Sequence, residues 1–578
     1  MTVRYTLKLA HINDTHSHFD PSRVQFLLTQ DNKQYEVYSQ SGGYARIGYQ
    51  VELARQKANQ AQQSFLFLHG GDSFQGTLYF SQFKGVANAD LLNRLKPDAM
   101  VLGNHEIDAG NEPVKNFLDN IQFPLLAGNM DLSQEELSKN APLSKHPRLY
   151  DYDHLTQTAK VLLKPIGDKQ LAIIGITLDQ MKEIARPDDD TLFANAIETT
   201  ANTVALLHQQ GIKHIVLLSH LGFDKDKQLA TEVDGISLII GGHSHTLQGD
   251  FKQLGINALP YGASVNNTPI IHAGKYAETL GLCDIEFDRE GHVISLVGGN
   301  YFMLDRHLLI ESDEQIAADD YQQLMNKLSA HPFILWDEED ESITEVIQSK
   351  YHPALTALEH QILGFIPKNL VHTRLPSKAL PHGSEIAPWV CKSIYHETQR
   401  ITDQVDFVLH NAGGVRQSLN KGAVTMADVL GRLLPFALPL VKYRIQGKYL
   451  CQAIESAINS ATNNSITGTG AGSFPYTYGL RYYYDGRKEK GSRVVKLEVL
   501  VYQDAVECWQ QIDTVAFYYG VSSAYTASGK EGYQALLNAE WQEEITELTL
   551  PEAFIRFMSR EQGLNGQLTP HVEYTSHL

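Results

Sequence analysis

Five apolar runs in the first half of the chain share one pattern: each ends abruptly in glycine, asparagine, aspartate, serine or histidine. They span residues 7–14, 65–73, 99–106, 215–222 and 238–245. Unbroken apolar runs of this kind predict strands that are buried on both faces. Residues 45–63 and 195–210, which lie between the runs, have helical patterns. The alternation predicts α/β layers, in which ligands bind beyond the carboxyl ends of the strands.

The rest of the chain predicts a division into three parts. Residues 276–301 have the pattern of closing strands of a first domain, and residues 311–363 are acidic and helical in pattern. From residue 364 the pattern changes to a second α/β domain, with a helix at 386–401 and strands at 406–410, 479–484, 493–501 and 515–525. We therefore expect a first domain, a helical connection and a second domain at residues 1–310, 311–363 and 364–578.

Composition and charge indicate a globular protein and argue against several kinds of partner. The chain has 578 residues, of which 43% are hydrophobic and 20% charged, as is usual for globular proteins. Its 48 basic and 67 acidic residues give a formal charge of −19, which argues against polymeric nucleic acid and anionic membranes as partners. No apolar run approaches the roughly 18–20 residues of a membrane helix. The sequence does not indicate an oligomeric state.

Cysteine usage and the N-terminus bear on the compartment. The four cysteines are far apart and form no CxxC pair, which argues against a disulfide framework and against a zinc ribbon. The first residues, MTVRYTLKLAHIND, lack the apolar core of roughly 7–15 residues that a secretory signal requires. We therefore expect a cytoplasmic protein as the sequence is written, or a periplasmic one if a leader has been removed.

The polar ends of the five runs carry side chains that can bind metals. They are Asp14, His16, Asp72, Asn104 with His105 and Asp108, His220, His243 and His245. Imidazole together with carboxylate suits Mn, Zn, Co, Fe or Ni, whereas an all-oxygen Mg or Ca site would not recruit four histidines. Asp72 follows two glycines and is well placed to bridge two ions. Two divalent ions exceed the charge of Asp14 and Asp72, so we predict a net positive site that binds phosphate.

The order of these motifs resembles a known family. The segments GDS, GNHE and GGHSH, after DTH and before AGKYAETLG, resemble the calcineurin-like metallophosphoesterase pattern, and their complete order resembles the bacterial 5′-nucleotidase/UDP-sugar hydrolase family. The resemblance implies an α/β protein with an N-terminal, four-layer-type β-sandwich flanked by helices, plus a second α/β domain that binds substrate. Residues 42–46 resemble the family's Gly-Gly-x-Ala-Arg element, which supports the resemblance rather than a catalytic role.

The resemblance also implies roles for the polar residues. One metal would be held by Asp14, His16, Asp72 and His245, and the other by Asp72, Asn104, His220 and His243. His105 and Asp108 would form a catalytic dyad, in which His105 reaches the phosphate and Asp108 orients its ring. A histidine near its natural pKa can stabilise developing charge or protonate a leaving group.

A substrate pocket is implied in the second domain by the same resemblance. Asn411-Ala-Gly-Gly-Val-Arg416 matches a family element, and the implied pocket residues are Arg374, Lys378, Asn411, Arg416, Phe436, Gly479, Tyr525 and Glu531. In the family, aromatic residues at the positions of Phe436 and Tyr525 enclose the nucleobase, and an acid at the position of Glu531 holds the ribose hydroxyls. Lys378, Tyr525 and Glu531 stand where the family usually has Arg, Phe and Asp, so the specificity residues match less well than the catalytic ones.

We therefore expect a two-metal phosphohydrolase that acts on small nucleotides, most readily 5′-nucleoside monophosphates, by in-line attack of a metal-bound hydroxide. Three alternatives use the same scaffold: a UDP-sugar pyrophosphohydrolase, a 2′,3′-cyclic nucleotide phosphodiesterase, and an enzyme acting on thiosulfate esters. A different class is a metal-bearing, nucleotide-binding protein without turnover. Hydrolysis of a phosphate ester would distinguish the enzymes from that binding protein.

Overall fold

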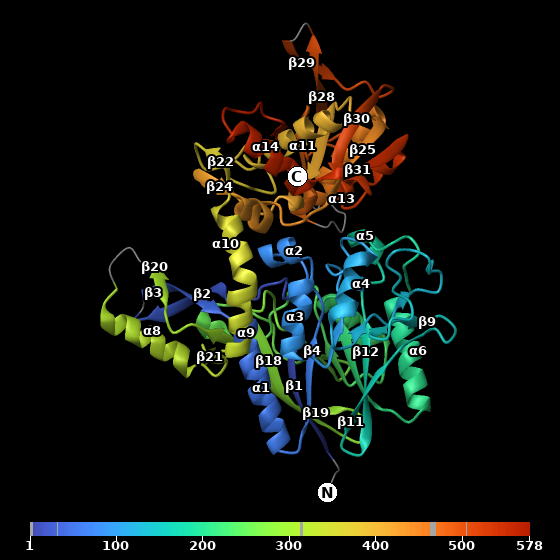
Figure 1. The fold of residues 1–578 in the computed structure, drawn as a ribbon, viewed down its shortest axis with the longest axis vertical. Coiled ribbons are helices and arrows are strands. Elements are labelled where there is room, and N and C mark those ends of the chain that lie inside the picture. The colour runs from blue at the N-terminus through green and yellow to red at the C-terminus, as the bar shows by residue number, and fades with distance from the viewer. Residues whose placement is uncertain (1–3, 32, 312–315, 463–469, 504–505, 578) are drawn as a thin grey trace. The chain divides into compact units, whose positions relative to one another are not determined.

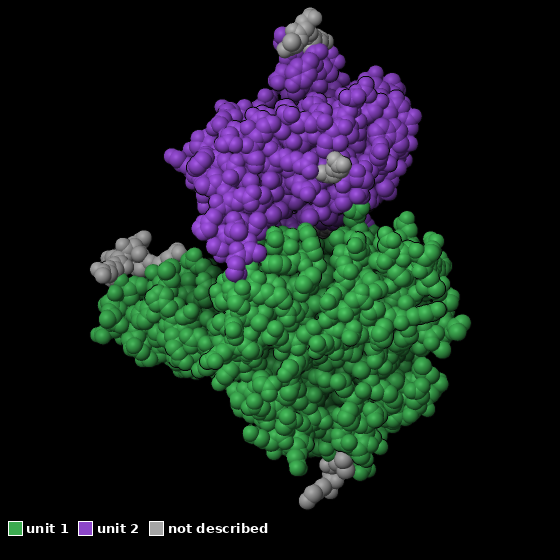
Figure 2. All heavy atoms as spheres, in the orientation of Figure 1, with its two compact units in different colours: residues 1–352 green, residues 353–578 purple. Residues whose placement is uncertain are grey.

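The computed structural model describes residues 4–31, 33–311, 316–462, 470–503 and 506–577. It divides into two compact units, residues 1–352 and 353–578 (Figure 2). The boundary falls inside the range predicted as the connection, whose residues 312–315 lie outside the described residues. The three-part division stays a prediction.

Two sheets form the centre of the first unit (Figure 1). The first sheet follows the order β2-β3-β19-β18-β1-β4-β5-β6-β8, with bounds β1 Tyr5–Ile12, β2 Ser22–Gln30, β3 Lys33–Ser41, β4 Ser64–His69, β5 Ala99–Val101, β6 Leu125–Leu126, β8 Leu149–Tyr150, β18 Thr279–Phe287 and β19 Val293–Leu304. The second follows the order β11-β12-β14-β15-β17-β16, with bounds β11 Leu162–Ile166, β12 Lys169–Ile176, β14 His214–Ser219, β15 Leu238–Ile240, β16 Ala263–Val265 and β17 Thr268–Ile271.

The sheets pack face to face and helices cover their outer faces. Leu9 and Leu68 of the first sheet share one buried cluster with Val216 and Ile240 of the second. The outer face of the second sheet packs against α6 (Ala196–Gln209) and α7 (Phe223–Glu232). The first sheet contacts α1 (Tyr44–Gln60). Helix α3 (Val86–Leu95) packs against α1, and α4 (Asn111–Asn120) packs against α3. The arrangement is helix, sheet, sheet, helix, which confirms the predicted four-layer fold.

Local sequence explains where these elements begin and end. All residues of β14 are buried, which matches its unbroken apolar run. The helix α6 begins after Asn195, whose side chain accepts a hydrogen bond from the Glu198 amide, and it ends before Gly211, whose φ of 80° favours glycine. The predicted closing strands are confirmed as β18 and β19, which pair in antiparallel register.

The predicted connection is only partly helical. It contains α8 (Ala318–Ala330), α9 (Glu341–Val346), a π-helical turn (Ile347–Tyr351) and α10 (His352–His360), but also β21 (Ile334–Trp336). β21 pairs in parallel with β19, so this stretch extends the first sheet. Three apolar residues within a long acidic stretch are too short a run to predict a strand from the sequence.

The second unit is also α/β. A five-stranded sheet has the order β26-β23-β30-β25-β31, with bounds β23 Phe407–Asn411, β25 Pro439–Gln446, β26 Pro475–Tyr478, β30 Phe517–Ser523 and β31 Trp541–Thr549. A four-stranded sheet has the order β29-β28-β27-β32, with bounds β27 Leu480–Tyr484, β28 Val494–Gln503, β29 Val506–Gln511 and β32 Val572–Tyr574. The helices are α11 (Ala387–Ile401), α12 (Gly447–Thr462) and α14 (Leu550–Glu561). Among the described helices, none is both long enough and apolar enough to cross a membrane.

One predicted strand of the second unit is too long. Residues 515–525 were expected to be extended, but β30 ends at Ser523 and a short helix, α13 (Ala524–Ala527), follows. The Ser523 side chain accepts a hydrogen bond from the Thr526 amide, which caps the helix. Tyr525 therefore projects from a helix rather than from a strand.

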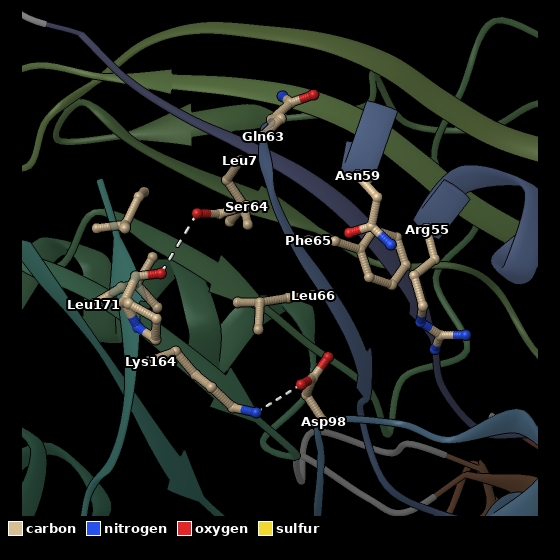
Figure 3. A pocket seen from close by; sticks show the side chains of 12 residues that line it. Leu7, Arg55, Asn59, Gln63, Ser64, Phe65, Leu66, Asp98, Lys164 and Leu171 are labelled. Atoms are coloured by element: carbon tan, nitrogen blue, oxygen red, sulfur yellow. Dashed lines mark hydrogen bonds and ion pairs between the residues drawn. The ribbon is translucent and has the colours of Figure 1, made fainter. Parts of the chain in front are cut away.

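A hollow of about 420 Å³ lies near the amino ends of β1 and β4, away from the polar ends of these strands (Figure 3). Leu7, Leu66 and Leu171 form part of its apolar lining. Its cations have partners: Lys164 Nζ lies 2.6 Å from Asp98 Oδ1, and Arg55 forms an ion pair with Glu52. We assign no ligand to it.

Arg46, the last residue of the Gly-Gly-x-Ala-Arg element, is buried and connects distant segments. Its NH1 donates to the carbonyl oxygens of Gln40 and Met303 at 3.0 and 2.9 Å, and its Nε lies 3.1 Å from Glu339 Oε1. Gly43 precedes α1 with a φ of 82°, a left-handed conformation that favours glycine. The element therefore fastens the start of α1 to the segment before α9.

Arg46→Ala should lower the free energy of unfolding of the first unit by about 3 kcal/mol, because it removes a buried side chain together with its hydrogen bonds to Gln40 and Met303 and its ion pair with Glu339. Urea denaturation followed by circular dichroism measures the change. Arg94→Ala is the control: Arg94 forms an exposed pair with Asp90 on α3, so its loss should be less than about 0.5 kcal/mol. Equal losses in the two variants would contradict the anchoring role of Arg46.

Candidate functional site

The loops after β1 and β4 are joined by their backbones. The amide nitrogens of Asp14, His16 and Ser17 donate to the carbonyl oxygens of Gly71, Asp72 and Ser73 at 2.9, 3.0 and 2.8 Å, respectively. β1 and β4 are parallel neighbours, so their carboxyl ends lie at the same edge of the sheet. These hydrogen bonds bring the side chains of Asp14, His16 and Asp72 together.

Five of the predicted metal ligands have left-handed backbone conformations. The φ angles of Asp14, His16, Asp72, His243 and His245 are 49°, 48°, 56°, 73° and 55°. A residue with a side chain pays about 1–2 kcal/mol for this conformation. Such strain persists only where surrounding contacts fix the backbone, and it is concentrated at functional sites.

The predicted ligands form overlapping groups of donors. Asp14 groups with His16 and His245, Asp72 groups with His16 and His105, and Asp72 also groups with His220 and His243; within each group the donor atoms lie within 4.8 Å of one another. The amide oxygen of Asn104 lies 2.9 Å from His243 Nδ1. The structure therefore brings all seven predicted ligands together, with Asp72 shared between groups.

The chemistry of His220 tests whether this donor set fits a cation. The His220 side chain is fully buried, and its Nδ1 lies 2.7 Å from the Gly70 carbonyl oxygen, which assigns the proton to Nδ1. Nε2 lies 3.2 Å from Asp72 Oδ2 but makes no hydrogen bond. Burial disfavours the charged imidazolium, but Asp72 outweighs it and raises the pKa of His220 to about 9, so without an ion Nε2 carries a proton. A bound cation would replace that proton between Nε2 and the carboxylate. The residues present therefore fit a bound metal ion.

Burial prepares the other imidazoles to act as ligands. It lowers the pKa of His243 to about 3 and that of His245 to about 4, with the charges of neighbouring groups as smaller influences. Both rings are therefore neutral near pH 7, as metal binding requires. Burial opposes ionisation of Asp72, but His220 and His105 outweigh it and hold the pKa of Asp72 well below its usual range. Asp72 is thus an anion that can bridge two cations.

His105 and Asp108 form the expected pair. His105 Nδ1 lies 2.5 Å from Asp108 Oδ2, and its Nε2 lies 4.0 Å from Asp72 Oδ2. Burial disfavours the charged imidazolium, but the carboxylates of Asp108 and Asp72 outweigh it and raise the pKa of His105 to about 10. Bound cations would draw this pKa down again because they neutralise Asp72.

Glu106 is a buried residue that the sequence reasoning missed. Its Oε1 accepts hydrogen bonds from the amides of Ser73 and Phe74 at 2.7 and 3.0 Å, and its Oε2 accepts from those of Asp72 and Gly103 at 3.0 and 2.9 Å. It therefore fixes the loop that carries Asp72. The available signal was an acid beside the dyad in Gly-Asn-His-Glu. Gly103 has a related reason to be glycine: a Cβ there would lie 2.1 Å from Asp72 Oδ1.

The second unit assembles most of the predicted pocket. Asn411 at the end of β23 is buried; its Oδ1 accepts from Thr526 Oγ1 at 3.2 Å, and its Nδ2 lies 3.4 Å from Glu531 Oε2. The Arg416 guanidinium lies 5.5 Å from the centre of the Phe436 ring. Burial raises the pKa of Glu531, while hydrogen bonds from Tyr525 and Asn411 and the charges of Arg374 and Arg416 oppose that rise. These interactions gather Arg374, Asn411, Arg416, Phe436, Tyr525 and Glu531.

Two predicted pocket residues lie apart from these interactions. Gly479 follows β26, whose Pro475 pairs with Asn411 and whose Tyr478 pairs with Val408, so Gly479 lies at the opposite end of β23 from Asn411. Its φ is 79°, and a Cβ there would lie 2.3 Å from the Asp406 carbonyl oxygen. The backbone alone therefore explains this glycine. Lys378 is exposed, four residues beyond Arg374.

Comparisons with known proteins agree with the geometry. Residues 7–247 match the family model "Calcineurin-like phosphoesterase", and residues 373–538 match "5′-nucleotidase, C-terminal domain". The chain is 31% identical to "Probable 5′-nucleotidase" of Treponema pallidum, covering 98% of this chain and 94% of that one. It is 29% identical to "NAD 5′-nucleotidase" of Haemophilus influenzae, covering 99% and 93%. The crystal structure of a 5′-nucleotidase precursor from Thermus thermophilus superposes with a TM-score of 0.70 at 27% identity, covering 98% and 99%.

The four-layer unit and its clustered aspartate and histidine donors thus define a calcineurin-like metallophosphoesterase, a hydrolase that works with two metal ions. With the second unit and the relatives that match along nearly its whole length, the chain belongs to the 5′-nucleotidase family. It is a metal-dependent phosphohydrolase.

Substitution of His220 by alanine should remove at least one of two divalent ions per chain, since it deletes a buried donor that faces Asp72. The measurement is metal content by mass spectrometry after EDTA treatment, loading with Mn²⁺ and removal of excess ion. His214→Ala, a buried imidazole at the other end of β14, is the matched control and should keep both ions. Retention of two ions by His220→Ala would show that His220 is not a ligand.

Proposed function

We propose that the protein removes the phosphate from 5′-nucleoside monophosphates. The observation that carries the proposal is the donor set of Asp14, His16, Asp72, Asn104, His220, His243 and His245 beside the His105–Asp108 pair. Imidazole and carboxylate favour Mn, Zn, Co, Fe or Ni over Mg or Ca. Two such ions, when bound, supply an activated water and neutralise the charge of the phosphoryl oxygens.

His105 is the protein's own catalytic group in this proposal. Asp108 accepts a hydrogen bond from Nδ1–H, which holds the ring with its Nε2 4.0 Å from Asp72 Oδ2. A protonated Nε2 donates a hydrogen bond to the phosphoryl oxygens as charge develops, or gives its proton to the departing nucleoside oxygen. Asp108 stabilises the imidazolium until that proton leaves.

Residues of the second unit bind the nucleoside in this proposal. Phe436 and Tyr525 provide aromatic faces for the base, which stacking stabilises by about 1–3 kcal/mol per ring. Glu531 and Asn411 offer an acceptor and a donor to the ribose hydroxyls. Arg374 and Arg416 offer forked guanidinium groups to an anionic group of the substrate, and the exposed Lys378 adds a point charge. Gly479 shapes the chain beside β23, and its contact with substrate stays a prediction.

A substrate panel tests the proposal. After loading with Mn²⁺, the protein should release phosphate from AMP, GMP or UMP, and EDTA treatment should abolish the release. NAD, ADP, UDP-glucose, 2′,3′-cyclic AMP and an aryl phosphate complete the panel, and NAD is included because a relative is named an NAD 5′-nucleotidase. Phe436→Ala should raise KM for the nucleotides about 5-fold to 100-fold and change that for the aryl phosphate less, because the aryl ring is smaller than a base and has no ribose to place it in the pocket.

The panel also separates the alternatives. Cleavage of NAD or UDP-glucose at the pyrophosphate yields two monophosphates and no free phosphate, so it is followed by chromatography of the nucleotides. Exclusive cleavage of either would replace the monophosphate with a pyrophosphate substrate. Turnover of the aryl phosphate alone would leave the metal site intact and refute the nucleoside pocket. Two bound metals with no turnover of any ester would make the chain a binding protein.

His105→Ala should lower kcat about 100-fold or more, with KM changed little, because general acid catalysis typically contributes at least that factor. Steady-state phosphate release gives both constants, and metal content confirms that two ions remain bound. Asp108→Asn, which keeps the shape of the partner but removes its charge, should lower kcat by less. A His105→Ala enzyme with unchanged kcat would remove His105 from the mechanism.

A further inference from the structure

Behind the histidine loops of the first unit lies a carboxylate with no exposure to solvent. Asp226, on α7, has a fully buried side chain. Its Oδ1 accepts the Ser219 hydroxyl at 2.5 Å, and its Oδ2 lies 2.8 Å from His272 Nε2. Ser219 and His272 are fully buried as well. None of the three has a role in the proposed reaction.

The three side chains tie together the carboxyl ends of neighbouring strands. Ser219 ends β14 and directly precedes His220, while His272 directly follows β17. Between these strands lies β15, whose next residue is Gly241, two positions before His243. Asp226 therefore contacts the segments from which the histidine ligands emerge.

Gly241 shows how tightly this group fits beneath the ligand loop. A Cβ at Gly241 would lie 2.1 Å from His272 Nε2 and 2.3 Å from Asp226 Oδ2. The backbone of the loop that carries His243 and His245 therefore rests directly on the Asp226–His272 pair. Any shift of the pair would move the loop.

The group is not a nucleophilic triad, although it contains serine, histidine and aspartate. In a nucleophilic triad the histidine lies between the serine and the acid and accepts the serine proton. Here Ser219 and His272 bind separate oxygens of the same carboxylate, and all three side chains are closed to solvent. No substrate reaches them.

Stability alone gives a weak reason for such a group. Burying a carboxylate costs several kcal/mol, and well-packed apolar residues are often as stable or more stable. Unlike apolar residues, the carboxylate forms directional hydrogen bonds, and its two oxygens hold Ser219 and His272 at fixed positions. Groups that hold metal-binding histidines in place are known to affect metal affinity strongly.

We propose that Asp226 is a positioning residue for metal binding: by holding Ser219 and His272 at once, it fixes the backbone that carries His220, His243 and His245. The inference rests on the metal dependence in the proposed function. Its predicted effect is on metal affinity, which is measured without turnover.

Asp226→Ala should weaken Mn²⁺ binding by about tenfold at one or both sites, the lower end of the cost of losing a ligand's own hydrogen-bond partner, because Asp226 acts through the backbone. Calorimetric titration of the EDTA-treated full chain with Mn²⁺ gives the affinity and the number of ions. In assays, kcat should fall at limiting Mn²⁺ and recover at high Mn²⁺, while KM for the nucleotide stays unchanged. Asp226→Asn, which keeps the shape and one acceptor, should lose less affinity.

His214→Ala separates positioning from general destabilisation. It removes a buried side chain from the opposite end of β14, so it should lower the thermal unfolding temperature without changing the Mn²⁺ affinity. If Asp226→Ala does not fold, Ser219→Ala decides the question, because it removes one contact and keeps the Asp226–His272 pair. A several-fold loss of affinity in Ser219→Ala would support the proposal.

Wild-type Mn²⁺ affinity in a folded Asp226→Ala protein, or in Ser219→Ala if the former does not fold, would reduce the group to a structural role and overturn the proposal. Failure of the proposed function gives a different result: the wild-type chain would bind its ions but release no phosphate from a nucleoside monophosphate. The affinities of the variants would still decide the positioning role in that case.

Discussion

The structure of the first unit depends on one constraint: the carboxyl ends of parallel strands from two packed sheets meet at the same edge. Asp14 and Asp72 come from the first sheet, and His220 and His243 from the second. Backbone hydrogen bonds between the loops of β1 and β4 hold the carboxylates, and hydrogen bonds from the His243 amide to both Asp14 oxygens join the two sheets' loops. The left-handed backbones follow from this crowding. Each ligand must leave its strand and turn immediately toward a shared centre.

Much of this unit could be predicted from the sequence because buried parallel strands leave a distinct signal. Runs such as residues 215–222 are apolar until they reach a polar end, and β14 and His220 occupy that range. Helices such as α6 and α11 followed from their apolar spacing. β2 and β3 were not predicted, since strands with one exposed face alternate polar and apolar residues and have a weaker pattern.

Other features were invisible because they exist only in three dimensions. Asp226 lies in the segment FDKDKQLA, where an acidic residue indicates a solvated helix face, yet the fold buries it against His272. Glu106 is the last residue of the Gly-Asn-His-Glu motif, and only the structure reveals the four backbone amides that donate hydrogen bonds to it. Gly479 shows the converse limit. A glycine in the sequence indicates that another group lies close to the backbone, but it does not show whether that group is a bound ligand or, as at Gly479, a carbonyl group of the chain.

The glycines at the metal site also bear on how this protein can diverge. Gly103 and Gly241 lie against the side chains of Asp72 and of the Asp226–His272 pair, so a single added methyl group has no room there. Substitutions at these two glycines would disturb the loops that carry the predicted metal ligands, and we expect selection to remove them. Arg374 and Arg416 in the second unit are exposed and can be exchanged at little cost to folding. If these two arginines bind substrate, as proposed above, substrate preference can drift across generations while the hydrolytic centre is inherited almost unchanged.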